Sequence, residues 1–288
     1  MKISGQLHLI IDFSVYLNVQ QDVIKSQQSL LMNAQIISPD TSITLFVKAI
    51  LVFESQKNDR VNLPFYADGY PGLLFQRCYG DFTIKPHDKK MPTIFLYGQT
   101  IKPISIDVTG PFQIIVFQFY PFVLRRFWGI SPESINDGCY DLDAPSNRAF
   151  HQLSSTLSSS SSVENSIQLL TQSLLSFFDS KKYNIDFSIQ RAILEIIEKK
   201  GQIIIKEIAK KEALNIRTFE RRFFKETGVS AKQFAKMVQF QAALKQLNSK
   251  DFQKLTEVVY ENGFSDQSHF IRVFKTFTGT TPTSFNKK

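Results

Sequence analysis

The C-terminal third of the chain contains the same pattern of residues twice, between residues 203 and 285. Two equivalent glutamates, Glu207 and Glu257, lie 50 positions apart, and two equivalent arginines, Arg221 and Arg272, lie 51 apart. Two copies joined by one helical segment are too few for a solenoid, which stacks many repeats. The repeat therefore predicts a bipartite unit that reads an extended partner.

The excess positive charge lies in the same part of the chain. Residues 182–288 contain 20 Lys and Arg against 11 Asp and Glu, whereas residues 1–181 contain 14 against 15. A basic part beside a nearly neutral one indicates that only the basic part binds a polyanion.

Each copy has the pattern of two helices joined by a tight turn. Asn215 and Ser265 are the expected N-caps of the second helices, and Gly228 and Gly279 the residues that end them. Residues 231–248 between the copies are expected to form one amphipathic helix, with Ser230 as its cap. The apolar residues expected inside are Ile204, Ile205, Ile208, Ala209, Phe219, Phe223 and Phe224 in the first copy and Leu255, Val258, Val259, Phe270, Val273, Phe274 and Phe277 in the second.

The residues expected on the outward faces have the chemistry of major-groove recognition. Arg can bind guanine and Gln adenine through two hydrogen bonds, and each good pair contributes ~1–3 kcal/mol. Solvated helix faces are the alternative, but charge localisation, tight turns and duplication together favour DNA. The outward set is Arg217, Glu220, Arg221 and Arg222 in the first copy and Asp266, Gln267, Ser268, His269 and Arg272 in the second. The lysines expected on phosphates are Lys206, Lys210, Lys211, Lys232 and Lys236.

Residues from about 188 to 288 closely resemble the AraC/XylS family of bacterial transcription regulators. The motifs that carry the resemblance are Glu207-Ile208-Ala209, residues 219–223, Gly228 and residues 263–270, with Arg272, Phe274, Lys275, Gly279 and Pro282. The resemblance implies two recognition helices in successive major-groove segments, ~34 Å apart. It assigns base reading to Arg217, Glu220, Arg221, Gln267, Ser268 and Arg272. The chain departs from the family at Gln239, where an arginine is usual, at Ala213, a frequent glycine, and at Val259, a frequent alanine.

Short Val, Ile and Phe runs separated by turn residues extend from about residue 36 to 120. They predict an antiparallel sheet curled into a barrel or a sandwich. A short helix at 122–128, ended by Gly129, should follow, and then a helix start with Ser131 as the N-cap and Pro132 in the first turn. Helices near 145–157 and 163–179, joined by a serine-rich loop, are expected after it. Residues 65–70 and 117–121 also resemble a barrel-like sensory domain of some AraC-type regulators, which implies effector binding, dimerisation or both.

Aromatic residues gather between residues 65 and 82 and suggest a pocket for an organic effector. The candidates are Phe65, Tyr66, Tyr70 and Phe75, with Tyr79 and Phe82 nearby. A role as ordinary core residues is the favoured alternative, because the chain contains 27 Phe.

No constellation of catalytic residues is visible in the sequence. His8, His87 and His151 are widely spaced, so no metal site is expected, and His87 is better explained by an exposed turn than by a ligand. Cys78 and Cys139 are too few for a disulfide framework or a four-thiolate zinc site. The absence of a signal segment and of a long apolar run predicts a soluble, cytoplasmic protein without a cofactor.

Together these observations predict an α+β chain with a cupin-like N-terminal barrel and a tandem helix-turn-helix unit. The expected divisions are an extension at 1–35, a β-rich sensory domain at 36–143, connecting helices at 144–181 as a candidate dimerisation segment, and a DNA-binding domain at 182–288. We expect a sequence-specific regulator that binds double-stranded DNA, responds to a small effector or to homodimerisation, and contacts RNA polymerase if it activates. A barrel-type enzyme with a DNA-binding tail and a ligand-independent architectural protein are the alternatives.

Overall fold

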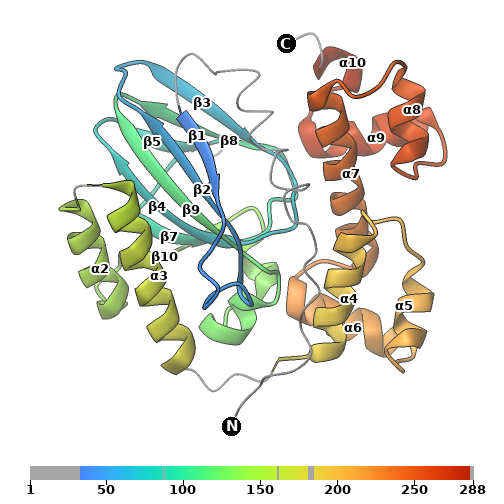
Figure 1. Ribbon diagram of the computed structural model, residues 1–288, viewed down its shortest axis with the longest axis horizontal. Coiled ribbons are helices and arrows are strands. Elements are labelled where there is room, and N and C mark those ends of the chain that lie inside the picture. The colour runs from blue at the N-terminus through green and yellow to red at the C-terminus, as the bar shows by residue number, and fades with distance from the viewer. Residues whose placement is uncertain (1–32, 87, 161, 181–184, 286–288) are drawn as a thin grey trace.

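The computed structural model describes residues 33–86, 88–160, 162–180 and 185–285. Two parts lie side by side: antiparallel sheets with two covering helices, and a group of helices formed by the C-terminal residues (Figure 1). The extension at 1–35 falls outside the described residues except for its last three, which begin the first strand. His8 and His87 also lie outside them.

The strands form two antiparallel sheets. The six-stranded sheet has the order β1-β2-β9-β4-β7-β10, and the four-stranded sheet the order β3-β8-β5-β6. The expected barrel-like domain is thus present as two packed sheets, which do not close on each other within the described residues. The strands are β1 (Asn33–Ile37), β2 (Val47–Ser55), β3 (Arg60–Phe65), β4 (Gly72–Cys78), β5 (Phe82–Lys85), β6 (Lys89–Lys90), β7 (Ile94–Tyr97), β8 (Ile104–Thr109), β9 (Phe112–Phe119) and β10 (Cys139–Asp141).

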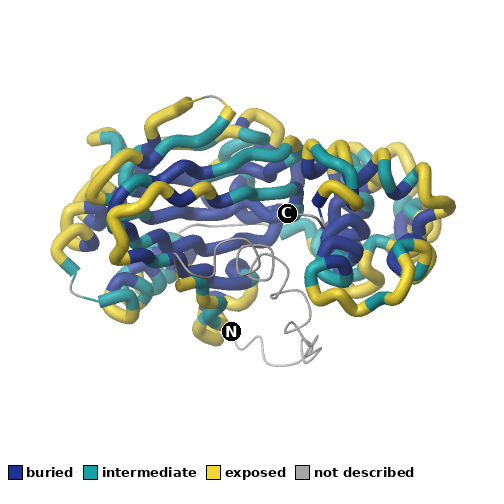
Figure 2. Tube along the Cα trace, turned by 90° about the horizontal axis from the view of Figure 1, so that it is seen from above, coloured by how far each residue is buried: buried dark blue, intermediate teal, exposed yellow. Residues whose placement is uncertain are grey.

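The six-stranded sheet is covered on both faces. On β9, Ile115 and Phe117 belong to a core shared with the helices, whereas Ile114 and Val116 belong to a core against the four-stranded sheet. Alternate residues of one strand therefore enter two different cores, which explains the nearly continuous apolar runs in the sequence. Figure 2 shows the buried residues running along the strands, with exposed residues at the turns.

Short helical segments and two longer helices follow the sheet strands. A π-helical turn (Leu124–Trp128) ends at Gly129, whose φ is 67°, and a 3-10 turn (Pro132–Ile135) precedes β10. The helices expected near 145–157 and 163–179 are α2 (Arg148–Ser158) and α3 (Val163–Ser180). They bury Leu157 and Leu174 in the core beneath the six-stranded sheet.

Seven helices form the described C-terminal part, and α7 runs through its middle (Figure 1). With 19 residues, α7 is about 28 Å long. It is buried on most sides, so the expectation of one apolar face and one polar face is wrong. The helices are α4 (Phe187–Glu198), α5 (Ile205–Lys211), α6 (Ile216–Thr227), α7 (Ala231–Ser249), α8 (Leu255–Glu261), α9 (Gln267–Thr278) and α10 (Pro282–Phe285).

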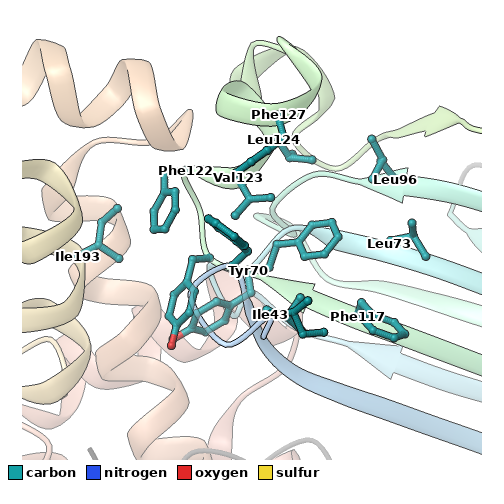
Figure 3. Packing of buried hydrophobic residues seen from close by; sticks show 14 of the residues in the cluster. Ile43, Tyr70, Leu73, Leu96, Phe117, Phe122, Val123, Leu124, Phe127 and Ile193 are labelled. Atoms are coloured by element: carbon teal, nitrogen blue, oxygen red, sulfur yellow. The ribbon is translucent and has the colours of Figure 1, made fainter. Parts of the chain in front are cut away.

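One hydrophobic cluster crosses from the sheets into the first helix pair. It includes Ile43 and Phe117 of the sheet region, Ile193 of α4 and Phe223 of α6. Figure 3 shows Ile193 opposite Phe122, at the place where the two parts of the chain meet. The second pair, α8 and α9, packs on α7 in a separate cluster. The two copies of the repeat therefore differ in how they are joined to the sheets.

The turn between the helices of each copy uses a left-handed residue. Ala213 has a φ of 55°, and Gly263, 50 positions later, has a φ of 73°. A Cβ atom makes this conformation unfavourable, and glycine avoids the cost. Ala213, a departure from the related family, is therefore strained where Gly263 is relaxed.

Replacing Ala213 by glycine should stabilise the chain. We expect Ala213→Gly to raise the free energy of unfolding by about 0.5–1 kcal/mol. Glycine removes the strain of the left-handed alanine, and the greater freedom of glycine in the unfolded chain offsets part of this gain. Urea unfolding measures this difference. The matched change Gly263→Ala should lower stability, because its new Cβ would also lie 2.8 Å from the Gln202 side chain. A less stable Ala213→Gly variant would contradict the assignment.

Candidate nucleic-acid interface

The two copies have helices of identical length. The first helices, α5 and α8, are both 7 residues long, and the second helices, α6 and α9, are both 12. The residue that shifts the offset from 50 to 51 therefore lies in the turn of the second copy. The scaffold is the same in both copies, and the second turn is one residue longer.

The caps of the second helices follow from these turns. Asn215 Oδ1 accepts a hydrogen bond from the Thr218 N–H at 2.8 Å, as expected for the N-cap of α6. In the second copy the cap is Asp266, which accepts from the His269 N–H at 2.7 Å. The prediction of Ser265 as the cap is wrong by one residue, because the longer turn moves the start of α9.

The base-reading candidates lie on α6 and α9, mostly exposed. Arg217 and Arg221 are exposed on α6, and all three candidates of α9 are exposed, namely Gln267, Ser268 and Arg272. Glu220 differs from them: it is half-buried, and its carboxylate accepts a hydrogen bond from the Ala231 N–H at 3.4 Å. Glu220 thus also contacts the first residue of α7.

Three expected side-chain orientations in the first copy are corrected. Ile204 and Phe224, expected inside, are 61% and 42% exposed. Arg222, expected outside, is half-buried, and its Nε donates to Asp186 Oδ2 at 2.7 Å. Burial acts to raise the pKa of Asp186, but the hydrogen bonds from Arg222 and the Ile189 N–H, together with the charges of Arg222 and Arg126, outweigh it and the pKa is lowered. The salt bridge removes Arg222 from the outward face.

The phosphate candidates divide into two groups. Lys206 and Lys210 are exposed on α5. Lys211 instead donates to Glu195 of α4 at 2.8 Å, and Lys199 donates to the same carboxylate at 2.7 Å. The bonds from Lys199 and Lys211 lower the pKa of Glu195. The charge of Lys211 is therefore already compensated within the chain.

A hollow of about 810 Å³ separates the two copies. Its lining brings together Lys211 of α5, Lys232 and Lys236 of α7, and His269 of α9. Lys206 and Lys210 do not line it. Residues from both copies and from the linking helix thus surround one concave surface, whose lining also includes Glu195, Glu207 and several isoleucines.

Two of the three departures from the related family, Gln239 and Val259, are accommodated in contacts with the second copy. Gln239 is buried in α7, and its Nε2 donates to the Asn262 carbonyl at 2.9 Å. Val259 is fully buried in the core of the second copy. Gln239 thus joins the linking helix to the end of α8.

The four aromatic effector candidates do not form one pocket. Phe65 packs beside Phe53 between the two sheets, and Phe75 belongs to the core beneath the helices. Tyr66 packs on Phe285 of α10, and Tyr70 lies in the core that reaches α4. The clustering of these residues in the sequence is not kept in space.

A group of polar residues that we did not select from the sequence surrounds Tyr70. Lys48 lies at a β-bulge in β2, with Nζ 3.6 Å from the Tyr70 ring centre, and a bulge re-aims its side chain. Asp68 accepts from the Tyr70 N–H at 3.0 Å and from Gln118 Nε2 at 2.8 Å. Tyr97 lies near the same carboxylate. Lys48 and Gln118 each interrupt an apolar strand, and this signal could have identified them.

The ionisable groups of this cluster have shifted pKa values. Burial raises the pKa of Asp68 to about 6, against the Tyr70 hydrogen bond and the charge of Lys48. Burial lowers the pKa of Lys48 to about 8, against the charge of Asp68. Burial and Asp68 together raise the pKa of Tyr97 well above its ordinary value. Burial therefore disfavours the charged forms of Asp68, Lys48 and Tyr97 in this part of the interior.

Solved structures with a similar arrangement include ToxT from Vibrio cholerae, at 11% identity and a TM-score of 0.46, over 89% of this chain and 98% of that chain. A ToxT structure with a bound unsaturated fatty acid is similar at 12% identity and a TM-score of 0.43, over 82% and 94%. The AraC-like transcriptional activator CuxR gives 12% identity and a TM-score of 0.27, over 78% and 91%. These low TM-scores support no conclusion about function.

Two protein families match parts of the sequence. Residues 35–141 match a family described as a domain of unknown function (DUF6597), and residues 208–288 match a family described as a helix-turn-helix domain. No curated protein matches the chain in sequence. Among the described residues, no helix combines the length and apolar content needed to cross a membrane. The helix-turn-helix match covers α6 to α10, so this part of the chain contains a helix-turn-helix domain, in agreement with the tandem motifs of its sequence.

Proposed function

We propose that α6 and α9 read two neighbouring segments of duplex DNA and that the N-terminal part adjusts this binding. The observation that supports the proposal best is the exposure of equivalent arginines, Arg221 and Arg272, on second helices that are both 12 residues long. Because the other exposed side chains differ between the copies, one chain should recognise an asymmetric site.

The proposed contacts follow from exposure and charge. Base reading is assigned to Arg217, Glu220, Arg221, Gln267, Ser268 and Arg272, with Glu220 limited by its contact with α7. Phosphate binding is assigned to Lys206, Lys210, Lys232 and Lys236, and Lys211 receives a smaller role because Glu195 compensates its charge.

For regulation, we propose that a small effector acts through the N-terminal part, residues 36–143. Of the aromatic candidates, Tyr70 is the one beside the Lys48 and Asp68 cluster. The loop that carries Asp68 also touches the linking helix, since the Ala67 carbonyl accepts from Gln241 of α7 at 2.6 Å. An effector that moves Asp68 would therefore also move Ala67, which is bonded to the linking helix of the DNA-binding unit.

Further proposals rest on the family resemblance. They are pairing of two copies through residues 144–181 and contact with RNA polymerase if the chain activates transcription. Action on chromosomal DNA fits a cytoplasmic location. No catalytic activity is proposed, because the residues assigned above bind rather than react.

The readout model is tested by selecting bound duplexes from a random pool, with and without cell extract. The wild-type chain should select a two-part sequence, and Arg221→Ala and Arg272→Ala should each lose ~1–3 kcal/mol of specific binding and relax one half. Arg222→Ala is the control, because it breaks the Asp186 salt bridge and should lower stability without changing base preference. Unchanged affinity and preference in both test variants would refute the model.

The phosphate role of Lys210 is tested separately through salt dependence. Lys210→Ala should weaken binding to selected and unrelated duplexes alike and reduce the slope of log affinity against log salt by ~1. Lys90→Ala removes an exposed charge from β6 of the N-terminal part and should leave the slope unchanged. If Lys210→Ala also leaves the slope unchanged, this lysine does not contact a phosphate.

The buried charge at the proposed effector region is tested through pH. The pKa of Asp68 is about 6 in the folded chain against an ordinary 3.8. The stabilising contribution of its protonation is therefore complete below about pH 4 and is lost as pH rises through about 6. We expect the free energy of unfolding to fall on this account over that interval, and Asp68→Asn should remove this part of the fall, as measured by urea unfolding.

Asp107→Asn is the control for this measurement. Burial acts to raise the pKa of Asp107, but hydrogen bonds from Asn62 and Arg60 outweigh it and the pKa is lowered. This variant should keep the fall between about pH 4 and 6. An identical pH profile for Asp68→Asn and the wild-type chain would show that Asp68 is not the group responsible.

A further inference from the structure

The N-terminal part binds the C-terminal end of the first recognition helix. Glu226, in the last turn of α6, is almost completely buried. Its Oε1 accepts from Arg126, in the π-helical turn, at 2.6 Å, and Arg125 Nε lies 3.9 Å from the same oxygen. Burial raises the pKa of Glu226, although Arg126 acts to lower it. A buried carboxylate is stabilised only if it is paired, and here the pairing arginine, Arg126, comes from the N-terminal part.

Two further bonds hold the backbone at the same end of α6. Gln99 Nε2 donates to the Thr227 carbonyl at 2.8 Å, and Asn136 Nδ2 donates to the Gly228 carbonyl at 2.9 Å. The last carbonyl groups of a helix have no partner inside the helix, so they are available for such contacts. Side chains from two separate segments of the N-terminal part therefore fix one helix end.

The two copies of the repeat differ in residue type at these positions. Glu226 corresponds to Phe277, and Arg222 to Val273, each 51 positions later. Phe277 and Val273 are buried in the hydrophobic core of the second copy. The first copy thus has charged residues at two positions where the second has core residues, and one of them contacts the N-terminal part.

Steric fit shows the same asymmetry. Gly228 and Gly279 end α6 and α9 with φ values of 76° and 75°. A Cβ added at Gly228 would lie 2.6 Å from the Glu133 backbone nitrogen, whereas one added at Gly279 would have Pro103 Cγ as its nearest neighbour, at 3.7 Å. The N-terminal part packs directly on the end of α6 and only loosely on the end of α9.

The contact is a poor means of gaining stability. Gln99 Oε1, Asn136 Oδ1 and Glu226 Oε2 are buried without a hydrogen-bond partner among the described residues. A buried polar atom without a partner opposes folding, so an apolar interface would serve stability better. Directional bonds to one helix end fix its position instead.

We propose that Arg126, Gln99 and Asn136 are positioning residues for DNA reading. They fix α6 to the N-terminal part, which also holds α7 through the bond from Gln241 to the Ala67 carbonyl, so they set where α6 stands relative to α9 and determine the spacing between the two halves of the DNA site. The inference rests on the proposed function, because it assumes that α6 and α9 each read bases. It gives the N-terminal part a role in specificity that needs no effector.

The matched variants Gly228→Ala and Gly279→Ala test this proposal in the full-length chain. Both introduce the same left-handed alanine, but only Gly228→Ala displaces the segment at Glu133. The probe is the duplex that the wild-type chain selects, with versions that carry one base pair more between the halves. We expect the insertion to weaken wild-type and Gly279→Ala binding about tenfold and Gly228→Ala binding much less.

A second variant keeps the test independent of backbone strain. The double change Arg126→Met with Glu226→Met removes the buried ion pair and leaves only Arg125, whose side chain is 30% exposed, without this carboxylate. The double variant should show the same tolerance to the insertion. A role in stability alone would lower binding to all duplexes by one factor and leave the spacing preference unchanged.

The possible outcomes separate the two levels of inference. If the wild-type chain selects no sequence, the proposed function fails, and this inference with it. If the wild-type chain selects a two-part site and both Gly228→Ala and the double variant keep its spacing preference, only the positioning role is overturned.

Discussion

A single hydrophobic core holds the sheets and the first helix pair together. It begins among the strands, continues through Ile193 of α4 and reaches Phe219 and Phe223 of α6. Protein interiors are close-packed, so the first pair cannot move away from the sheets without exposing this core. The second pair packs on α7 in a separate core, which only Ala67 and Tyr66 of the described sheet region reach. The two copies have helices of equal length, but only the first shares the main core with the sheets.

Local features of the fold could be predicted from the sequence because their causes are local. Asn215 caps α6, Ser230 caps α7, and glycines end α6 and α9, as expected from cap preferences. The cap of α9 could not be placed, because both Ser265 and Asp266 suit the position and the turn length decides between them. The sequence pattern also could not show which strands belong to which of the two sheets, because that depends on pairing between distant segments.

The exposed residues of the candidate site could be predicted from the sequence. The residues that form salt bridges with distant parts of the chain could not. The arginines at 221 and 272 are exposed because each lies two residues from the buried phenylalanines of its helix and so on the opposite face. The salt bridges of Arg222 and Lys211 were not predicted, because their partners come from a different helix: Asp186 caps α4 and Glu195 lies within it. Helix periodicity describes one helix at a time and does not show which carboxylate will lie beside it.

The burial of α7 against both copies makes its length a geometric constant of the molecule. An α-helix turns about 100° and advances about 1.5 Å with each residue. One residue inserted between Phe234, which packs in the first core, and Phe240, which packs in the second, would rotate one copy about the other by more than a quarter turn. If α6 and α9 read bases as proposed, a change of an exposed side chain alters which base is read, whereas a residue gained or lost in the linking helix moves the two helices out of register on the duplex.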